Sequence, residues 1–203
     1  MNFHRQPFHL DDEDENKKEG KSKDLMLEKM LEARTILLTG QVNKEMAERV
    51  ARQLILMESM SSDPIKVFID SPGGDADSGF AIVDMLRFVE PDVYTIGMGL
   101  VASAGALILL AAPKDNRLSL PNSHYLIHQP LSGIRGVATE IEIYAKEIDN
   151  MKQKINKLIS EETGKSLKQV AKDTDRDYWM NPEEARKYGL ISRIVSRRSE
   201  LDV

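Results

Sequence analysis

The chain has 203 residues, which suits one domain, or one domain with a tail. Hydrophobic residues make up 41% of the chain, enough for a substantial core. Its net charge is −5, from 28 basic and 33 acidic residues, so we expect no nucleic-acid partner. The absence of cysteine excludes disulfides, thiolate metal ligands and a cysteine nucleophile.

The first residues differ in composition from the rest of the chain. Residues 11–24, DDEDENKKEGKSKD, hold no apolar side chain, and an acidic block passes into a lysine-rich one. We predict a disordered charged tail over residues 1–24 and a folded domain over residues 25–203. No signal-peptide core is present, and the longest apolar run, residues 100–113, is short of the roughly 20 residues of a membrane span. We therefore expect a cytoplasmic protein with no membrane partner.

Strand-like and helix-like segments alternate in the first half of the folded region. A helical pattern over residues 25–33 precedes strands predicted at 35–39, 65–69 and 93–96, and a helix is expected after each strand. Asn43 is placed to cap the first of these three helices. This alternation predicts an α/β fold with a largely parallel sheet.

The second half of the chain is predicted to hold two short strands, at 118–120 and 124–128, and three more helices. Thr139 and Glu142 form a capping box that would open a helix of about 24 residues, closed by Gly164. A helix about twice the usual length, with one strongly charged face, favours a contact with a neighbouring subunit, so we predict an oligomer. Caps of the last two helices are expected at Ser166, Asn181 and Gly189.

Ser103 is placed where a strand gives way to a buried helix, in the stretch VYTIGMGLVASAGALILLAA over residues 93–112. Gly97 and Gly99 are expected to turn the backbone sharply after the strand. A hydroxyl at the start of a helix faces unpaired N–H groups that stabilise negative charge. Ser103 is thus a candidate nucleophile, and a helix cap or a small core residue is the alternative.

The loop SPGG, residues 71–74, follows the preceding strand and should lie at the same edge of the sheet as Ser103. Its two glycines let the backbone approach a ligand and aim N–H groups at it, as an oxyanion hole requires. A plain turn is the alternative interpretation. It accounts for the glycines, but it does not account for their place beside the serine one strand away.

His128 ends a predicted strand, where a general base could lie, and a partly buried structural histidine is the alternative. An acid that orients this histidine would complete a serine–histidine pair. Asp173, Asp175 and Asp177 are the candidates, and their positions in the sequence do not choose among them.

Two other kinds of site are disfavoured by the pattern. Residues 97–102 fit the dinucleotide motif G-x-G-x-x-G/A, but no acid follows at the position that a ribose needs. His124 and His128 are four residues apart on a strand, and no third ligand is obvious, so no metal site is expected.

Five segments in this order resemble the ClpP family of serine peptidases. They are SPGG (71–74), GLVASAG (99–105), IHQP (127–130), GVATEIEI (136–143) and KDTDRDYWMNPEEARKYGLI (172–191). The similarity covers residues 35–195. The resemblance implies a ClpP/crotonase-like fold, with a handle helix protruding from the peptidase domain at about residues 133–164.

The resemblance also implies a serine endopeptidase and assigns its site. Ser103 matches the nucleophile of the family, His128 its general base and Asp177 its orienting acid. The backbone N–H groups of Gly74 and Ala104 match its oxyanion hole.

The same resemblance implies how the subunit would work. Asp175 and Arg176 match a contact between rings, and the handle would interleave two homo- or hetero-heptameric rings into a tetradecamer. Unfolded polypeptides would be hydrolysed to short peptides inside this chamber. An AAA+ unfoldase such as ClpX, ClpA or ClpC would feed them in and use the ATP, so the subunit itself would need no cofactor and no metal.

The chain departs from the family pattern in three places. GLVASAG stands where GMAASMG is usual, which changes Leu100, Val101 and Ala104, and SPGG is followed by the acidic residues Asp75 and Asp77. The charged tail replaces the stretch that forms the axial pore loops. A weakly active structural subunit, a second paralogue in a mixed assembly, is therefore one alternative. An acyl-CoA enzyme of the crotonase type is another, disfavoured because such enzymes need no Ser-His-Asp set.

Overall fold

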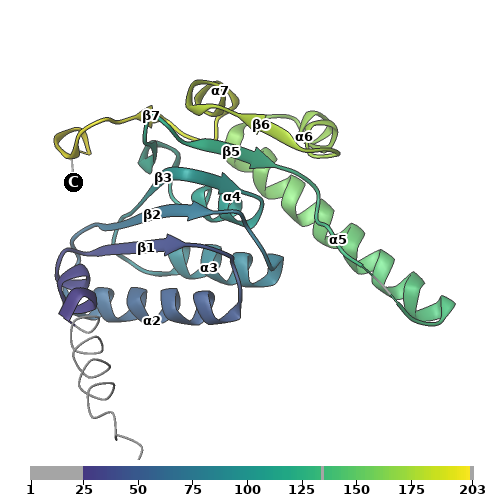
Figure 1. Cartoon of the computed structure of the whole chain (residues 1–203), viewed down its shortest axis with the longest axis horizontal. Coiled ribbons are helices and arrows are strands. Elements are labelled where there is room, and N and C mark those ends of the chain that lie inside the picture. The colour runs from purple at the N-terminus through teal and green to yellow at the C-terminus, as the bar shows by residue number, and fades with distance from the viewer. Residues whose placement is uncertain (1–24, 134, 202–203) are drawn as a thin grey trace, which may run out of the picture. The chain divides into compact units, whose positions relative to one another are not determined.

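The computed structural model describes residues 25–133 and 135–201 (Figure 1). The chain divides into two units between residues 33 and 34, of which the structure describes residues 25–33 in the first and residues 34–133 and 135–201 in the second. In the first unit, residues 25–32 are helical, as predicted, and the predicted tail lies outside the described residues.

A seven-stranded sheet forms the centre of the second unit. Its strands are β1 (Thr35–Thr39), β2 (Ile65–Ser71), β3 (Val93–Ala102), β4 (Arg117–Ser119), β5 (His124–Ile127), β6 (Tyr178–Met180) and β7 (Arg193–Ile194). Strands β1, β2, β3, β4 and β7 pair in that order and are parallel. Strand β5 pairs in parallel with β3 and antiparallel with β6. The predicted α/β fold with a largely parallel sheet is confirmed.

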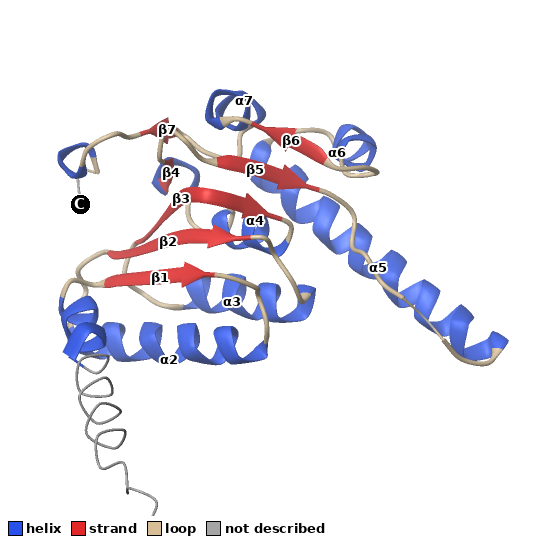
Figure 2. Cartoon of the chain, viewed as in Figure 1, coloured by secondary structure: helices blue, strands red, loops and turns tan. Residues whose placement is uncertain are grey.

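The helices follow the strands in the predicted alternation. They are α2 (Lys44–Met60), α3 (Ala76–Phe88), α4 (Ala104–Leu109), α5 (Ala138–Thr163), α6 (Leu167–Asp173) and α7 (Pro182–Tyr188), with short 3-10 turns η1 (Lys114–Asn116) and η2 (Arg198–Glu200). Figure 2 shows α2 and α3 alongside β1 to β3, and α5 extending away from the sheet. None of the helices within the described ranges is long and apolar enough to cross a membrane.

Three of the caps predicted at helix starts are confirmed. Asn43 accepts a hydrogen bond from Met46 N at the start of α2, and Ser166 accepts one at the start of α6. Asn181 and Glu184 form a reciprocal capping box at α7. Each cap satisfies N–H groups that the first turn of a helix leaves without a partner.

The predicted turn at Gly97 and Gly99 is wrong, because β3 continues through both glycines to Ala102. A Cβ at Gly97 would lie 2.3 Å from the Tyr125 hydroxyl. A Cβ at Gly99, where φ is 58°, would lie 2.7 Å from the Asp70 carboxylate. The glycines therefore make room for side chains that cross the strand, and the register of β2 against β3 shifts beside them.

The capping box predicted at Thr139 and Glu142 is also wrong. Helix α5 begins at Ala138, its N-cap is Val137, and no side-chain cap bond is made. The helix has 26 residues and ends at Gly164, whose φ of 73° confirms the predicted cap at that end. Its first half exposes apolar side chains, and Ile155, Leu158 and Ile159 in its second half are buried.

Candidate active site

A cavity of about 540 Å³ opens where the loops after β2, β3 and β5 meet. Those loops contribute Gly74, Ser103 and His128 to its lining, and α5 contributes an apolar wall that includes Met151 and Ile155. The carboxyl ends of neighbouring parallel strands share one edge of a sheet, which explains why residues far apart in sequence meet here.

Ser103 is the N-cap residue of α4, but its side chain makes no capping hydrogen bond. Its φ of 54° is positive; among the described residues that are not glycine, only Arg34 shares this property. Such a conformation costs about 1–3 kcal/mol and persists only where the surroundings hold it. The Ser103 N–H donates to Leu126 O at 2.9 Å, and all six residues of the helix that follows are buried. The hydroxyl is thus held at the cavity and is not used as a helix cap.

The diglycine loop approaches Ser103 closely. At Gly73, where φ is 89°, a Cβ would lie 2.5 Å from Ser103 Cβ and 2.9 Å from Ala104 N. At Gly74 a Cβ would lie 2.2 Å from Val42 O. Neither position has space for a side chain, which explains why both residues are glycine. Val42 anchors it from the other side, since its N–H donates to Gly73 O at 2.8 Å.

His128 is hydrogen-bonded to one of the three candidate aspartates. Its Nδ1 lies 2.9 Å from Asp177 Oδ1, and its side chain is 15% exposed. Because this bond engages Nδ1, Nε2 is the ring nitrogen that can accept a proton. The other two aspartates have different partners: Asp173 accepts a hydrogen bond from the Tyr188 hydroxyl at 3.0 Å, and Asp175 lies 3.8 Å from the Lys152 ammonium.

The residues that differ from the ClpP pattern make defined contacts around the site. Asp75 is the N-cap of α3 and accepts a hydrogen bond from Ser78 N at 2.7 Å, and Asp77 lies in the first turn of the same helix. Both acids also line the cavity. The N–H of Leu100 donates to Asp70 at 2.9 Å, and Val101 is fully buried.

Asp175 and Arg176, which were predicted to contact another ring, lie beside the site. Arg176 is 90% exposed, and its Nε lies 4.0 Å from Asp175 Oδ2. The Asp175 carbonyl accepts a hydrogen bond from Gln129 Nε2 at 2.7 Å, which ties this segment to the residue after His128. Across residues 25–133 and 135–201, no group of three or more His, Cys, Asp or Glu side chains is placed to hold a metal ion.

A parallel α/β sheet that brings a serine, a diglycine loop and an aspartate-bound histidine to one cavity is typical of serine hydrolases. The chain belongs to the Clp protease family, which matches it over residues 17–198. It is therefore a serine endopeptidase of the ClpP type, and the crotonase alternative is set aside.

Individual relatives agree with this assignment. The chain is 60% identical over 189 residues to the ATP-dependent Clp protease proteolytic subunit 2 of Treponema denticola, which covers 93% of this chain and 94% of that one. It is 46% identical to the proteolytic subunit 3 of Rhizobium etli, over 92% and 99% of the two chains. A solved structure, a point mutant of ClpP1 from Listeria monocytogenes, matches with a TM-score of 0.82 and 49% identity, over 87% of this chain and 99% of that one. The predicted ClpP fold is confirmed.

Proposed function

We propose that Ser103, His128 and Asp177 are the catalytic triad of this peptidase and that the N–H groups of Gly74 and Ala104 form its oxyanion hole. The observation that carries the proposal is the 2.9 Å hydrogen bond between His128 and Asp177, beside the cavity that Ser103 and Gly74 line. The alternative acids are engaged elsewhere, and the serine hydroxyl makes no cap bond.

These proposed roles imply the following chemistry. His128 Nε2 takes the Ser103 proton as the oxygen attacks a peptide carbonyl, and the Asp177 carboxylate stabilises the imidazolium that forms. The Gly74 and Ala104 N–H groups donate to the resulting oxyanion. The tetrahedral intermediate collapses as His128 gives its proton to the leaving amine. Water, activated by the same histidine, then hydrolyses the acyl-enzyme and restores the serine.

The substrates and partners in this proposal come from the family. The subunit would cut unfolded polypeptides to short peptides within stacked heptameric rings, a tetradecamer in the cytoplasm. A Clp unfoldase such as ClpX, ClpA or ClpC would bind ATP and deliver the substrate, and the subunit would need no cofactor. Two relatives are named proteolytic subunits of an ATP-dependent protease, which supports this division of work.

A second candidate function is a weakly active ring subunit that works with another paralogue. The relatives with numbered names, subunit 2 in Treponema denticola and subunit 3 in Rhizobium etli, favour it. In that case the triad would become fully active only in a mixed ring.

Labelling with a fluorophosphonate tests both candidates. We expect the purified chain to be labelled at Ser103 and the Ser103→Ala variant to remain unlabelled, with a rate loss of several orders of magnitude on peptides. Labelling that appears only after a second paralogue is added would favour the mixed assembly. Labelling of another residue, or no labelling under either condition, would contradict the triad.

A further inference from the structure

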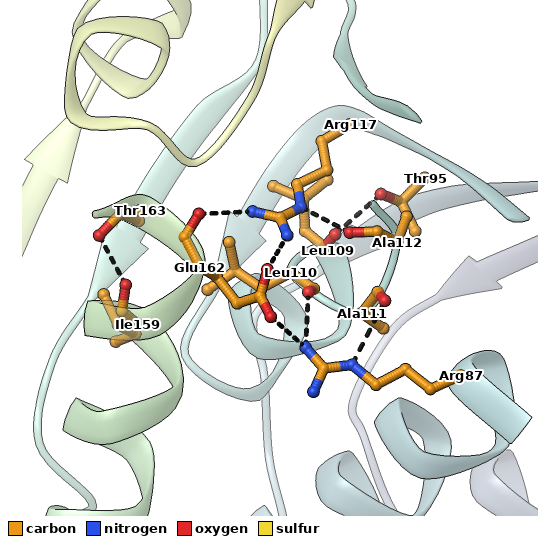
Figure 3. A network of polar contacts seen from close by, with 10 residues as sticks. All are labelled: Arg87, Thr95, Leu109, Leu110, Ala111, Ala112, Arg117, Ile159, Glu162 and Thr163. Atoms are coloured by element: carbon orange, nitrogen blue, oxygen red, sulfur yellow. Dashed lines mark hydrogen bonds and ion pairs between the residues drawn. The ribbon is translucent and has the colours of Figure 1, made fainter. Parts of the chain in front are cut away.

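Side chains from other elements hold the C-terminal end of α4, the helix that begins after Ser103 (Figure 3). Four successive backbone carbonyls, those of residues 109–112, each accept a hydrogen bond from a side chain. The bonds run from Thr95 Oγ1 to Leu109 O (2.8 Å), from Arg87 Nη2 to Leu110 O (3.1 Å), from Arg87 Nε to Ala111 O (3.4 Å) and from Arg117 Nε to Ala112 O (2.7 Å). The carbonyls of Leu109 and Leu110 are ones that the last turn of α4 leaves without a partner, and those of Ala111 and Ala112 follow directly after the helix. The two guanidinium charges lie at the negative end of the helix dipole.

Glu162, next to the last residue of α5, joins the two arginines. Its Oε1 accepts a hydrogen bond from Arg87 Nη2 at 2.7 Å, and its Oε2 pairs with Arg117 Nη2. Its backbone carbonyl accepts a further bond from Arg117 Nη1 at 3.0 Å. The Arg117 side chain is 1% exposed, and burial lowers its pKa while the Glu162 charge opposes that effect. One carboxylate therefore balances two guanidinium groups, one of them fully buried.

The two helices that this network joins also form part of the wall of the cavity. Helix α4 contributes Leu107 to the lining, and α5 contributes Ile155 and Ile159, one turn before Glu162. Helix α4 has six residues and spans only about 9 Å, so a shift at its C-terminal end is carried to Ser103 at the other end.

We propose that Glu162 is a positioning residue for the peptidase reaction, acting through Arg87 and Arg117. It ties α4 to α5 and so sets where Ser103 and the Ala104 N–H lie relative to the substrate. This inference rests on the proposed role of Ser103. Without the carboxylate, two like charges would face each other at the end of α4, one of them buried without a counter-ion. A displacement of a reacting group by about 1 Å can cost up to a hundredfold in rate.

Glu162→Gln in the full chain, in its assembled form, tests the proposal. We expect the maximal rate of fluorophosphonate labelling at Ser103 to fall about tenfold while the apparent affinity for the probe stays unchanged, since Glu162 does not line the cavity. Glu162→Asp restores the charge and should recover part of the rate. Glu183→Gln is the matched control, because Glu183 also pairs with an arginine, Arg186 at 2.7 Å, but on α7. It should label at the wild-type rate.

The outcomes separate positioning from stability alone. A lower melting temperature for Glu162→Gln with an unchanged maximal labelling rate of the folded protein would overturn the proposal. If Glu162→Gln does not fold, Arg87→Gln takes its place, because the Arg87 side chain is 40% exposed and its loss leaves no buried charge unpaired. An unchanged rate in that variant would likewise overturn it. A wild-type chain that does not label, either alone or with a second paralogue, would overturn the triad as well, whereas labelling at equal rates in all variants would overturn only the role of Glu162.

Discussion

At the scale of single residues, the site depends on backbone space that only glycine leaves. Gly73 has a positive φ, and a methyl group on it would overlap both Ser103 and the Ala104 N–H. Gly40 has a similar φ of 88°, but a Cβ there would meet nothing within 4 Å. Substitutions at the two positions therefore separate the effect of backbone strain from the effect of crowding Ser103.

We predict that Gly73→Ala abolishes fluorophosphonate labelling of Ser103, because the new methyl group displaces the serine or the oxyanion loop. Gly40→Ala should cost only about 1 kcal/mol of unfolding free energy and leave labelling intact. Labelling rates and thermal unfolding of both variants are the measurement. Equal labelling of the two variants would contradict the close approach between Gly73 and Ser103.

The choice among the three aspartates gives a second prediction. Asp177→Asn should lower peptide turnover by about four orders of magnitude, since the amide no longer stabilises the imidazolium or favours the tautomer with Nε2 free. Asp173→Asn should leave turnover nearly unchanged, because Asp173 bonds to Tyr188 and not to His128. Turnover of a fluorogenic peptide by both variants is the measurement. A large loss in Asp173→Asn with little loss in Asp177→Asn would assign the orienting acid to Asp173.

Tyr125 gives a prediction about pH. Burial raises the pKa of Tyr125 to about 12, and the nearby hydroxyls of Ser119 and Ser123 oppose this rise. Neither serine hydroxyl donates to the Tyr125 oxygen, because each donates to a backbone carbonyl. The buried Tyr125 hydroxyl has no hydrogen-bond partner among the described residues.

Below pH 10 the tyrosine is neutral in both the folded and the unfolded chain, so its contribution to stability is constant. Between pH 10 and about 12 the unfolded chain loses this proton first, so stability falls as the pH rises. We expect Tyr125→Phe to remove this part of the alkaline loss and to change unfolding free energy by no more than about 1 kcal/mol at pH 7. Denaturant unfolding of both proteins from pH 7 to 11 tests it, and parallel alkaline losses would be contrary to the assignment.

At the scale of elements, local patterns predict what depends on neighbours in the chain. Asn43, Ser166 and Asn181 cap helices as predicted because a cap bonds to backbone two or three residues away. The turn predicted at residues 97–99 fails because the two glycines make room for Tyr125 and Asp70, which approach from other strands. Only tertiary contact distinguishes a glycine that turns the chain from one that makes room.

The site also combines features that the local sequence predicts with features that depend on tertiary contacts. The serine, the diglycine loop and the histidine could be predicted, because each follows a strand whose end lies at a shared edge of the sheet. The partner of His128 could not be chosen from the residues alone, since three aspartates alternate within five positions. Arg87 and Glu162 are 75 residues apart in the sequence, so no local sequence pattern could have predicted that they pair.

At the scale of the whole molecule, exposed apolar side chains mark where further subunits would bind. In the first half of α5, Ile141, Ile143 and Tyr144 are 42%, 61% and 57% exposed, on a helix that extends from the sheet (Figure 1). Ile141 and Tyr144, three residues apart, share one face of the helix, and exposed apolar side chains gathered on one face are typical of a protein–protein interface. This exposure supports the oligomer that the length of the helix predicts.

Arg176 provides the last prediction, which concerns assembly. Its side chain is 90% exposed, and its nearest described carboxylate, Asp175, lies at the 4.0 Å limit of an ion pair, so it contributes little to the fold of one subunit. If it binds across a ring contact, Arg176→Ala should leave the melting temperature of the subunit nearly unchanged but shift the assembly from the proposed tetradecamer toward single rings or the monomer of about 23 kDa. Peptide turnover should fall with it, because the Asp175 carbonyl is bonded to the residue after His128.

Sedimentation velocity measures the shift in assembly. Arg52→Ala is the control, since the Arg52 side chain is 78% exposed and pairs with Glu48 on its own helix. Intact tetradecamers with full turnover in Arg176→Ala would show that this arginine makes no contact between rings.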